Sequence, residues 1–133
     1  MQKYIEHLKR NAPAAPNELS IFLSKVDFTP LADYIDFIKM SNGAQGKIGE
    51  NSYLQIWQIG ELFQYNKDYE VDLYAPGYFI FATNLGGTAY AFNKMDSSIV
   101  QFEFVGMLID DDPIFCGSTL SEFFSYLYIQ AEE

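Results

Sequence analysis

Apolar residues recur with helical spacing over the first third of the chain. The pattern predicts a short helix over residues 1–10 and a second helix over residues 17–26, separated by a proline-containing break. A third helix is expected to begin at Thr29, because a capping threonine there precedes a proline in the first turn. It is expected to end at Asn42-Gly43, where glycine tolerates the left-handed conformation that closes many helices.

Two more helices are expected in the rest of the chain. Residues 61–73 carry apolar side chains on one helical face. Near the C-terminal end, Thr119 can cap a helix, and Glu122 stands at the position that completes a capping box.

The middle of the chain has the apolar patterns of strands. Strands are expected over residues 53–57, 78–83, 88–93 and 99–105, and residues 43–49 are expected to form a loop or a bent strand. The turn residues Gly86 and Gly87 lie between two of these strands, which predicts a β-hairpin. Helices at both ends around antiparallel strands predict a single α+β domain over residues 1–133.

The composition supports a well-formed core. Hydrophobic residues make up 49% of the 133 residues, and 12 Phe, 10 Tyr and one Trp supply large apolar side chains. The single cysteine, Cys116, excludes an internal disulfide. Because the sequence has neither a signal-peptide pattern nor a long apolar stretch, we expect a soluble cytoplasmic protein.

The charge is strongly negative and unevenly distributed. The chain has 18 acidic and 8 basic residues, a formal net charge of -10. Residues 95–133 contain Asp96, Glu103, Asp110, Asp111, Asp112, Glu122, Glu132 and Glu133 but neither Lys nor Arg. Because nucleic acids and anionic membranes would repel such a protein, we expect it to bind neither, and we expect a cationic partner if there is one.

The residues that carry chemistry do not form a catalytic pattern. The only histidine, His7, and the only cysteine, Cys116, cannot supply a zinc site of the usual nitrogen and sulfur type. The run Asp110-Asp111-Asp112 lacks the spaced ligands and the glycine turn of a calcium loop, so a solvated loop or an acidic contact surface is expected there. We therefore expect no metal, no cofactor and no enzymatic activity.

Trp57 and a series of tyrosines are candidates for surface anchors. The series comprises Tyr65, Tyr69, Tyr74 and Tyr78. Tyrosine and tryptophan supply large contact areas at little cost in rotamer entropy, although a place in the core is an open alternative for each of them.

Several motifs occur together in one order along the chain. They are Leu31-x-x-Tyr34-x-x-Phe37, Ser41-Asn42-Gly43, Gly46-x-x-Gly49, Trp57, Tyr65 with Tyr69, Tyr74-Ala75-Pro76-Gly77, residues 81–92 and Ser121-Glu122-Phe123-Phe124-x-x-Leu127. Over roughly residues 15–130 this order resembles the SUKH superfamily, in its largest branch, named after yeast cell-wall-assembly regulators of the Smi/Knr type.

The chain departs from this family in its hairpin. The family commonly has Ser-Asp-Gly-Gly-Gly-Glu at the turn, whereas this chain has Thr83, Asn84, Leu85 and Thr88 around its two glycines, and Asn93 stands where an Asp is common. If the missing carboxylates contact a partner in the family, the partner of this chain differs.

The resemblance implies a fold and a function. The fold would be a curved, mainly antiparallel sheet flanked by helices. Bacterial members resemble immunity proteins that neutralise contact-dependent or secreted polymorphic toxins, many of them nucleases with basic clefts. The eukaryotic branch looks regulatory, and neither branch is expected to be catalytic.

Charge and resemblance together predict an immunity protein that binds its cognate toxin through an acidic surface. The expected contacts are Asp110, Asp111, Asp112, Glu70 and Asp72, with Trp57 and Tyr74 as apolar anchors; they are inferred from charge and turn position. The structural turns are expected at Asn42-Gly43 and Gly86-Gly87. We expect a monomer or a weak homodimer. A regulatory scaffold or a small-ligand-binding domain without a toxin partner is the alternative.

Overall fold

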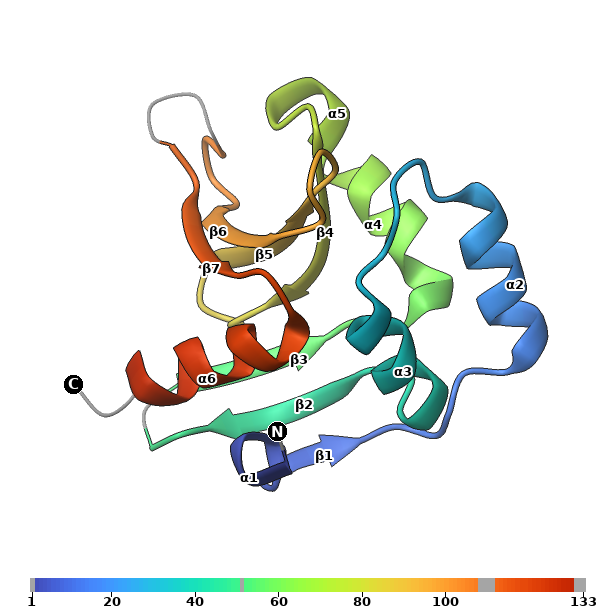
Figure 1. Cartoon of the computed structure of the whole chain (residues 1–133). Coiled ribbons are helices and arrows are strands. Elements are labelled where there is room, and N and C mark those ends of the chain that lie inside the picture. The colour runs from blue at the N-terminus through green and yellow to red at the C-terminus, as the bar shows by residue number, and fades with distance from the viewer. Residues whose placement is uncertain (1, 51, 108–111, 131–133) are drawn as a thin grey trace.

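The strands of the described residues form one antiparallel sheet, in which the spatial order follows the chain order. The computed structural model describes residues 2–50, 52–107 and 112–130 (Figure 1). The strands are β1 (Leu8–Arg10), β2 (Ala44–Ile48), β3 (Ser52–Ile56), β4 (Tyr78–Thr83), β5 (Thr88–Asn93), β6 (Ile99–Glu103) and β7 (Ile114–Gly117). This architecture, with its helices, confirms the predicted α+β fold.

The sheet is curved, and its pairing explains why. β3 meets β4 through only two residue pairs, Gln55 with Thr83 and Ile56 with Ala82, so little pairing opposes a change of direction of the sheet at this point. The register shifts within the β4–β5 pair and again within the β6–β7 pair. Such irregularities bend strands and increase their twist, and Figure 1 shows β4 to β7 turned away from β1 to β3.

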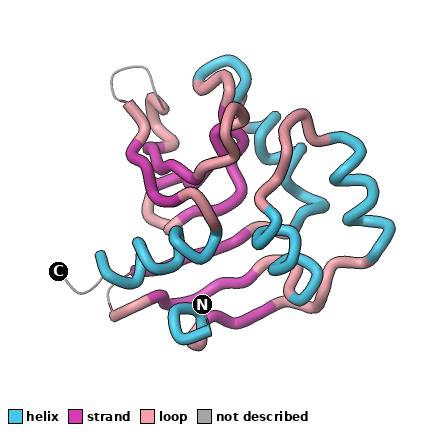
Figure 2. Tube along the Cα trace, in the orientation of Figure 1, coloured by secondary structure: helices cyan, strands magenta, loops and turns pink. Residues whose placement is uncertain are grey.

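Helices pack around this sheet. They are α1 (Gln2–Ile5), α2 (Pro16–Lys25), α3 (Ala32–Met40), the 3₁₀ helix η1 (Ile59–Glu61), α4 (Leu62–Asp68), α5 (Val71–Tyr74) and α6 (Leu120–Gln130). α6 contacts β7, β2, β3 and α3, whereas α4 and α5 contact β4. Figure 2 shows α2, α3 and α4 (cyan) grouped at one side of the strands (magenta).

The core is built from aromatic rings of distant elements. Tyr34 of α3 lies 5.5 Å from Phe81 of β4 and 5.0 Å from Phe92 of β5, measured between ring centroids. Phe81 also contacts Phe123 of α6 at 5.8 Å. All four side chains are fully buried. Contacts between aromatic rings therefore pack α3 and α6 against the sheet.

The N-terminal segment differs from the prediction of one helix over residues 1–10. Of the described residues 2–10, only those of α1 are helical, and Leu8–Arg10 forms the edge strand β1, paired with β2. So short a segment with few apolar positions gains little from forming a helix alone, because helix nucleation is costly. Pairing with β2 supplies backbone hydrogen bonds instead, and Gly46 permits the close approach, because a Cβ there would lie 2.8 Å from the His7 carbonyl oxygen.

Two helix starts also differ from the prediction. α2 begins at Pro16 rather than after an Asn17 cap, and the Glu18 carboxylate accepts a hydrogen bond from the Ala15 N–H. α3 begins at Ala32 with Leu31 as its N-cap, so Thr29 does not cap it. The predicted cap at Thr119 is present, since its Oγ1 accepts the Glu122 N–H.

Two further elements in the second half differ as well. The helix predicted over residues 61–73 is broken at Glu70, whose backbone is left-handed at φ 54°, so η1, α4 and α5 replace it. The edge strand β7 was not expected. Its four residues lack the alternation of buried and exposed side chains that identifies a strand in a sequence, because the first two are exposed and the last two are buried. Within residues 43–49, Ala44–Ile48 forms the strand β2, which pairs with β3.

The Ser41-Asn42-Gly43 segment joins three parts of the fold. The Asn42 side-chain oxygen accepts the Ile59 N–H at 2.9 Å, and its backbone N–H donates to the Ala12 carbonyl at 2.8 Å. Gly43 has φ 95°, and a Cβ there would lie 2.7 Å from the Ile56 carbonyl oxygen. The pair predicted as a helix end therefore also holds the neighbouring β3–η1 connection in place.

The N-terminus of α6 is held by a residue of α3. Both carboxylate oxygens of Asp33 accept backbone N–H groups of α6, from Leu120 and Ser121, each at 3.0 Å. The Asp33 side chain is half-buried at this place. Free N–H groups at a helix N-terminus favour such a carboxylate.

Within the described ranges, no helix is long and apolar enough to cross a membrane.

Candidate functional site

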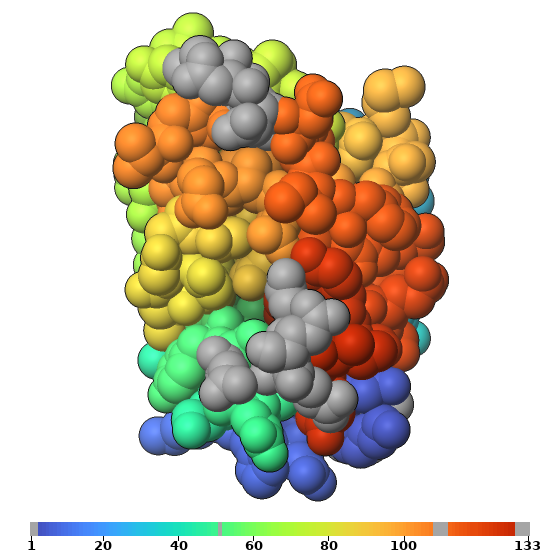
Figure 3. Space-filling view, turned by 90° about the vertical axis from the view of Figure 1, so that its left-hand side faces the viewer, coloured from blue at the N-terminus to red at the C-terminus, as the bar shows by residue number. Residues whose placement is uncertain are grey.

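The acidic residues of the C-terminal region lie at different places on the fold. Asp96 lies in the β5–β6 turn and Glu103 at the other end of β6. Asp96 shapes its own turn, because its carboxylate accepts hydrogen bonds from the Ser98 N–H and hydroxyl, and these bonds lower its pKa. Figure 3 shows the face over which the chain beyond β5 (orange to red) spreads.

Of the predicted Asp110-Asp111-Asp112 run, the first two residues lie outside the described residues. Asp112 is exposed and lines an open hollow of about 440 Å³ with Glu103, Gln101 and Ile114. Two carboxylates at one hollow form a small acidic surface beside β6. It is not continuous with Asp96, which lies at the opposite end of that strand.

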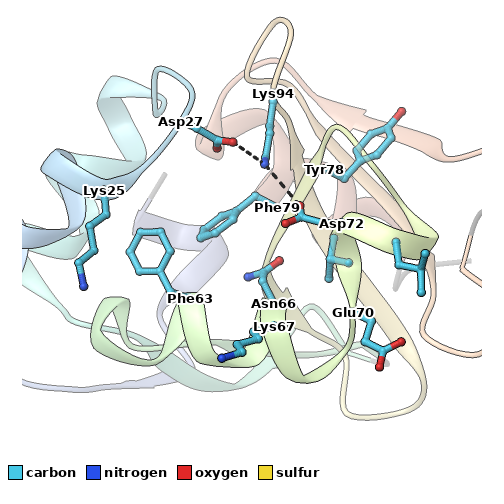
Figure 4. A pocket seen from close by; sticks show the side chains of 12 residues that line it. Lys25, Asp27, Phe63, Asn66, Lys67, Glu70, Asp72, Tyr78, Phe79 and Lys94 are labelled. Atoms are coloured by element: carbon cyan, nitrogen blue, oxygen red, sulfur yellow. Dashed lines mark hydrogen bonds and ion pairs between the residues drawn. The ribbon is translucent and has the colours of Figure 1, made fainter.

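Glu70 and Asp72 line a second hollow, between α2, α4, α5 and β4, of about 410 Å³ (Figure 4). Its lining contains as many bases as acids: Lys25, Lys67 and Lys94 with Asp27, Glu70 and Asp72. The Lys94 ammonium lies 2.9 Å from a carboxylate oxygen of Asp27 and 3.9 Å from one of Asp72. The two predicted acidic contacts are therefore accompanied by cations, which reduce the negative potential that a partner would meet.

The floor of this hollow serves the fold. Asn66 of α4 donates hydrogen bonds to the Leu62 and Ile80 carbonyls and accepts the Ile80 N–H at 2.8 Å. These bonds fasten α4 to β4 where the β4 register shifts. Phe63 and Phe79 pack beside them at 5.6 Å between centroids. The polar groups at the floor thus have partners within the protein.

A third hollow, of about 450 Å³, is lined mainly by aromatic rings. We call it the aromatic groove; its lining is Gln55, Trp57, Tyr65, Tyr69, Thr83, Leu85, Gly87 and Phe104. Trp57 follows β3, Tyr65 is on α4, Tyr69 is its C-cap and Phe104 follows β6. The groove therefore forms only where the end of β3, α4 and the β4–β5 turn meet.

The rings contact one another closely. The Trp57 ring lies 4.6 Å from that of Tyr65, and it is nearly parallel to the Tyr69 ring at 6.4 Å. Phe104 lies 4.6 Å from Tyr69. Trp57 itself is 9% exposed, but Tyr69 and Leu85 at the rim are 43% and 51% exposed. The rim is thus open to a partner, while the tryptophan provides a fixed floor.

Carboxylates stand at two sides of the aromatic groove. The Tyr65 hydroxyl donates to Glu61 at 2.5 Å, and this bond raises the pKa of Tyr65. Glu103 accepts a hydrogen bond from the Thr88 hydroxyl, and one of its oxygens lies 3.6 Å from the position of a Cβ on Gly87. The groove lining contains no Lys, Arg or His. No Asp or Glu lines it either, so the charge comes from Glu61 and Glu103 beside the groove, and no cation of the lining offsets them, unlike in the hollow at Asp72.

Among the predicted anchors, Trp57 lies in this groove and Tyr74 does not. Tyr74 is 44% exposed on α5. Gly87 of the predicted turn lines the groove, whereas Phe104 and Leu85 were not among the predicted contacts. Tyr65 and Tyr69 were candidate anchors in the sequence. Their i, i+4 spacing places both on one helical face, and this was the sequence signal that they could share one surface.

Metal-ligating side chains and the single thiol are the remaining groups that could carry chemistry. In the part of the chain that the structure describes, no group of three His, Cys, Asp or Glu side chains could hold a metal ion. Cys116 is buried in β7, and burial raises the pKa of its thiol to about 12. The thiol is therefore protonated at neutral pH and a poor nucleophile.

These features define a small, acidic α+β domain whose open hollows are suited to contacts rather than to enclosing a substrate. Residues 13–126 match the SMI1 / KNR4 family (SUKH-1), and the chain belongs to this family. The predicted family is thereby confirmed. None of the curated proteins compared with the chain matches it significantly.

Proposed function

We propose that the protein is an immunity protein that binds and neutralises a cognate toxin protein without catalysing a reaction. Membership of the SMI1 / KNR4 family (SUKH-1) carries the proposal, because it suggests binding of a partner protein. The net charge of -10 favours a partner whose contact surface is positively charged. A nuclease toxin, whose cleft must be cationic to hold a polyanionic substrate, fits this requirement.

Electrostatics would make such a protein fast as well as specific. Complementary charge can raise association rate constants towards about 10⁸–10⁹ M⁻¹s⁻¹ at low salt. The described acids best placed to contribute are Glu103 and Asp112, which share one hollow and have no lysine in its lining. Glu70 and Asp72 are weaker candidates, because Lys25, Lys67 and Lys94 lie around them.

The first experiment tests binding and stoichiometry together. The open reading frame beside this gene is expressed with it in the cytoplasm, and the two products are co-purified. We expect a complex, rescue of growth, and inhibition of the toxin that is complete at equimolar protein. Inactivation by far less than one equivalent would instead indicate an enzyme that modifies the toxin. Failure of the neighbouring product to bind would favour a regulatory or ligand-binding domain.

A second experiment tests the charge argument. Association rates are measured over a range of salt concentrations for wild type and for Glu103→Gln combined with Asp112→Asn. Glu70→Gln combined with Asp72→Asn is the matched control, because it also removes two charges, but from a lining that contains Lys25, Lys67 and Lys94. We expect the variant at Glu103 and Asp112 to lower the association rate and the salt dependence more than the control does. Equal rates for all three proteins would refute electrostatic steering but not binding.

A further inference from the structure

We propose that the aromatic groove is the docking site for a lysine or arginine side chain of the partner protein. This inference rests on the proposed function, since it names the chemistry by which the partner is held. The occupant is defined by the groove itself: aromatic rings supply the contact surface, and carboxylates at two sides supply a charge of one sign.

The rings offer what a cation binds best. The chain has a single tryptophan, Trp57, which lines the groove together with Tyr65, Tyr69 and Phe104. The faces of tryptophan and tyrosine carry negative partial charge, and a cation within about 6 Å of a ring centroid is attracted to it. Because Trp57 and Tyr69 are nearly parallel, with their centroids 6.4 Å apart, they present similarly oriented rings to one incoming group.

Hydrogen bonds hold Trp57, the floor of the groove, in its place. The Trp57 indole N–H donates to the Gln55 side-chain oxygen at 3.1 Å, and Gln55 donates in turn to Gln45 at 3.1 Å. The Trp57 backbone N–H donates to the Phe81 carbonyl at 3.0 Å. A ring that is fixed before binding loses little freedom when the partner arrives, which favours its use as an anchor.

Charge separates this groove from the hollow at Asp72. Glu61 stands at the Tyr65 side and Glu103 at the Gly87 side. The hollow at Asp72 also has aromatic rings, but there Lys25 already lies over the Phe63 ring at 5.9 Å, and Lys94 pairs with Asp27. In the aromatic groove the lining supplies no cation of its own. A cation from the partner fits this place, whereas an anionic group would be repelled by both carboxylates.

The single tryptophan allows the groove to be tested directly. Because Trp57 is the only tryptophan, the indole fluorescence of the protein reports on the groove alone. The probes are three peptides: acetyl-Gly-Arg-Gly-amide, acetyl-Gly-Lys-Gly-amide and acetyl-Gly-citrulline-Gly-amide. Citrulline is an uncharged shape mimic of arginine. We expect saturable changes in emission with the two cationic peptides and little change with citrulline. Equal responses to arginine and citrulline would overturn the proposal.

Variants locate the binding and control for folding. Tyr69→Leu keeps an apolar side chain but removes the ring, and it is expected to weaken peptide binding about three- to tenfold. Tyr69→Phe, which keeps the ring, should bind nearly as wild type does. Tyr74→Leu is the matched control, because Tyr74 is equally exposed, at 44% against 43%, but lies outside the groove. Glu103→Gln should also weaken binding, without removing an aromatic ring.

The same variants separate the two proposals when the neighbouring toxin is the ligand. If the toxin binds wild type and competes with the arginine peptide, and Tyr69→Leu weakens its binding while Tyr74→Leu does not, both proposals hold. If the toxin binds Tyr69→Leu and wild type equally, the groove proposal fails and the immunity function stands. If no toxin binds but the peptides do, the immunity function fails, and the groove's chemistry is retained for another cationic partner.

Discussion

The hydrogen bond from the Ile59 N–H to the Asn42 side chain offers the sharpest test of what holds this fold together. Asn42 is 7% exposed and Ile59 is 1% exposed, so water cannot readily replace the side-chain oxygen as an acceptor. In Asn42→Ala, the bond of 2.9 Å disappears and the Ile59 N–H is left buried without it.

The expected loss of stability follows from that geometry. A buried donor that loses its acceptor costs about 1–3 kcal/mol. We therefore expect the free energy of unfolding to fall by about 2 kcal/mol, with a decrease in Tm of about 5–10 °C for a chain of this size. Asn42→Asp keeps an oxygen at the acceptor position and should lose less than Asn42→Ala.

The measurement is urea unfolding, followed by Trp57 fluorescence and by far-ultraviolet circular dichroism. The exposed Asn17, in the first turn of α2, provides the surface control Asn17→Ala, which should change stability by less than about 0.5 kcal/mol. If Asn42→Ala is no less stable than this control, the Asn42 side chain does not hold η1 in place, and the reasoning fails.

Three other predictions concern single side chains. The Tyr34 hydroxyl is buried and lacks a hydrogen-bond partner among the described residues, so Tyr34→Phe should raise the free energy of unfolding by about 1 kcal/mol; a loss of that size in denaturant unfolding would mean that the hydroxyl is bonded. Burial raises the Cys116 thiol pKa from 9.0 to about 12, so the thiol stays neutral in the folded protein while it ionises in the unfolded chain. Stability should therefore fall as pH rises from about 9 towards 12, and it should fall less steeply in Cys116→Ala, an expectation contradicted if both proteins show the same slope. Glu70→Gly should gain about 0.5–1 kcal/mol over Glu70→Ala, because only glycine adopts φ 54° without strain; equal melting temperatures for the two variants would show that this strain is absent.

Local patterns predicted the elements whose residues lie close together in the chain. The β4–β5 hairpin was predicted because two apolar stretches flank the glycine turn, and the α6 cap was predicted because Thr119 and Glu122 are three residues apart. The strands β1 and β7 were missed for the opposite reason. Both are short and lie at the edges of the sheet, so each depends on a neighbouring strand rather than on its own pattern.

The candidate site was predicted only in part. Trp57 and the glycine turn were named from the sequence, and the structure brings Trp57 and Gly87 into one groove. Phe104 was missed, because a residue just beyond β6 shows no local sign that it will meet α4. For Glu70 and Asp72, the sequence predicted an acidic contact. It did not show that lysines distant in the chain, such as Lys25 and Lys94, lie around the same hollow.

The sequence by itself determined the α+β class, the family and the excess of acidic residues, since these depend on composition, on local patterns and, for the family, on the order of motifs along the chain. Only the tertiary structure decided which acidic side chains have lysines beside them and which aromatic rings share a surface. In one hollow, Lys94 pairs with Asp27, which is far from it along the chain. In another, the rings that follow β3 and β6 meet those of α4 and its C-cap, with Glu61 and Glu103 beside them. Electrostatic and aromatic interactions depend on distance in space, and those distances are set by how the strands pair and how the helices pack on them.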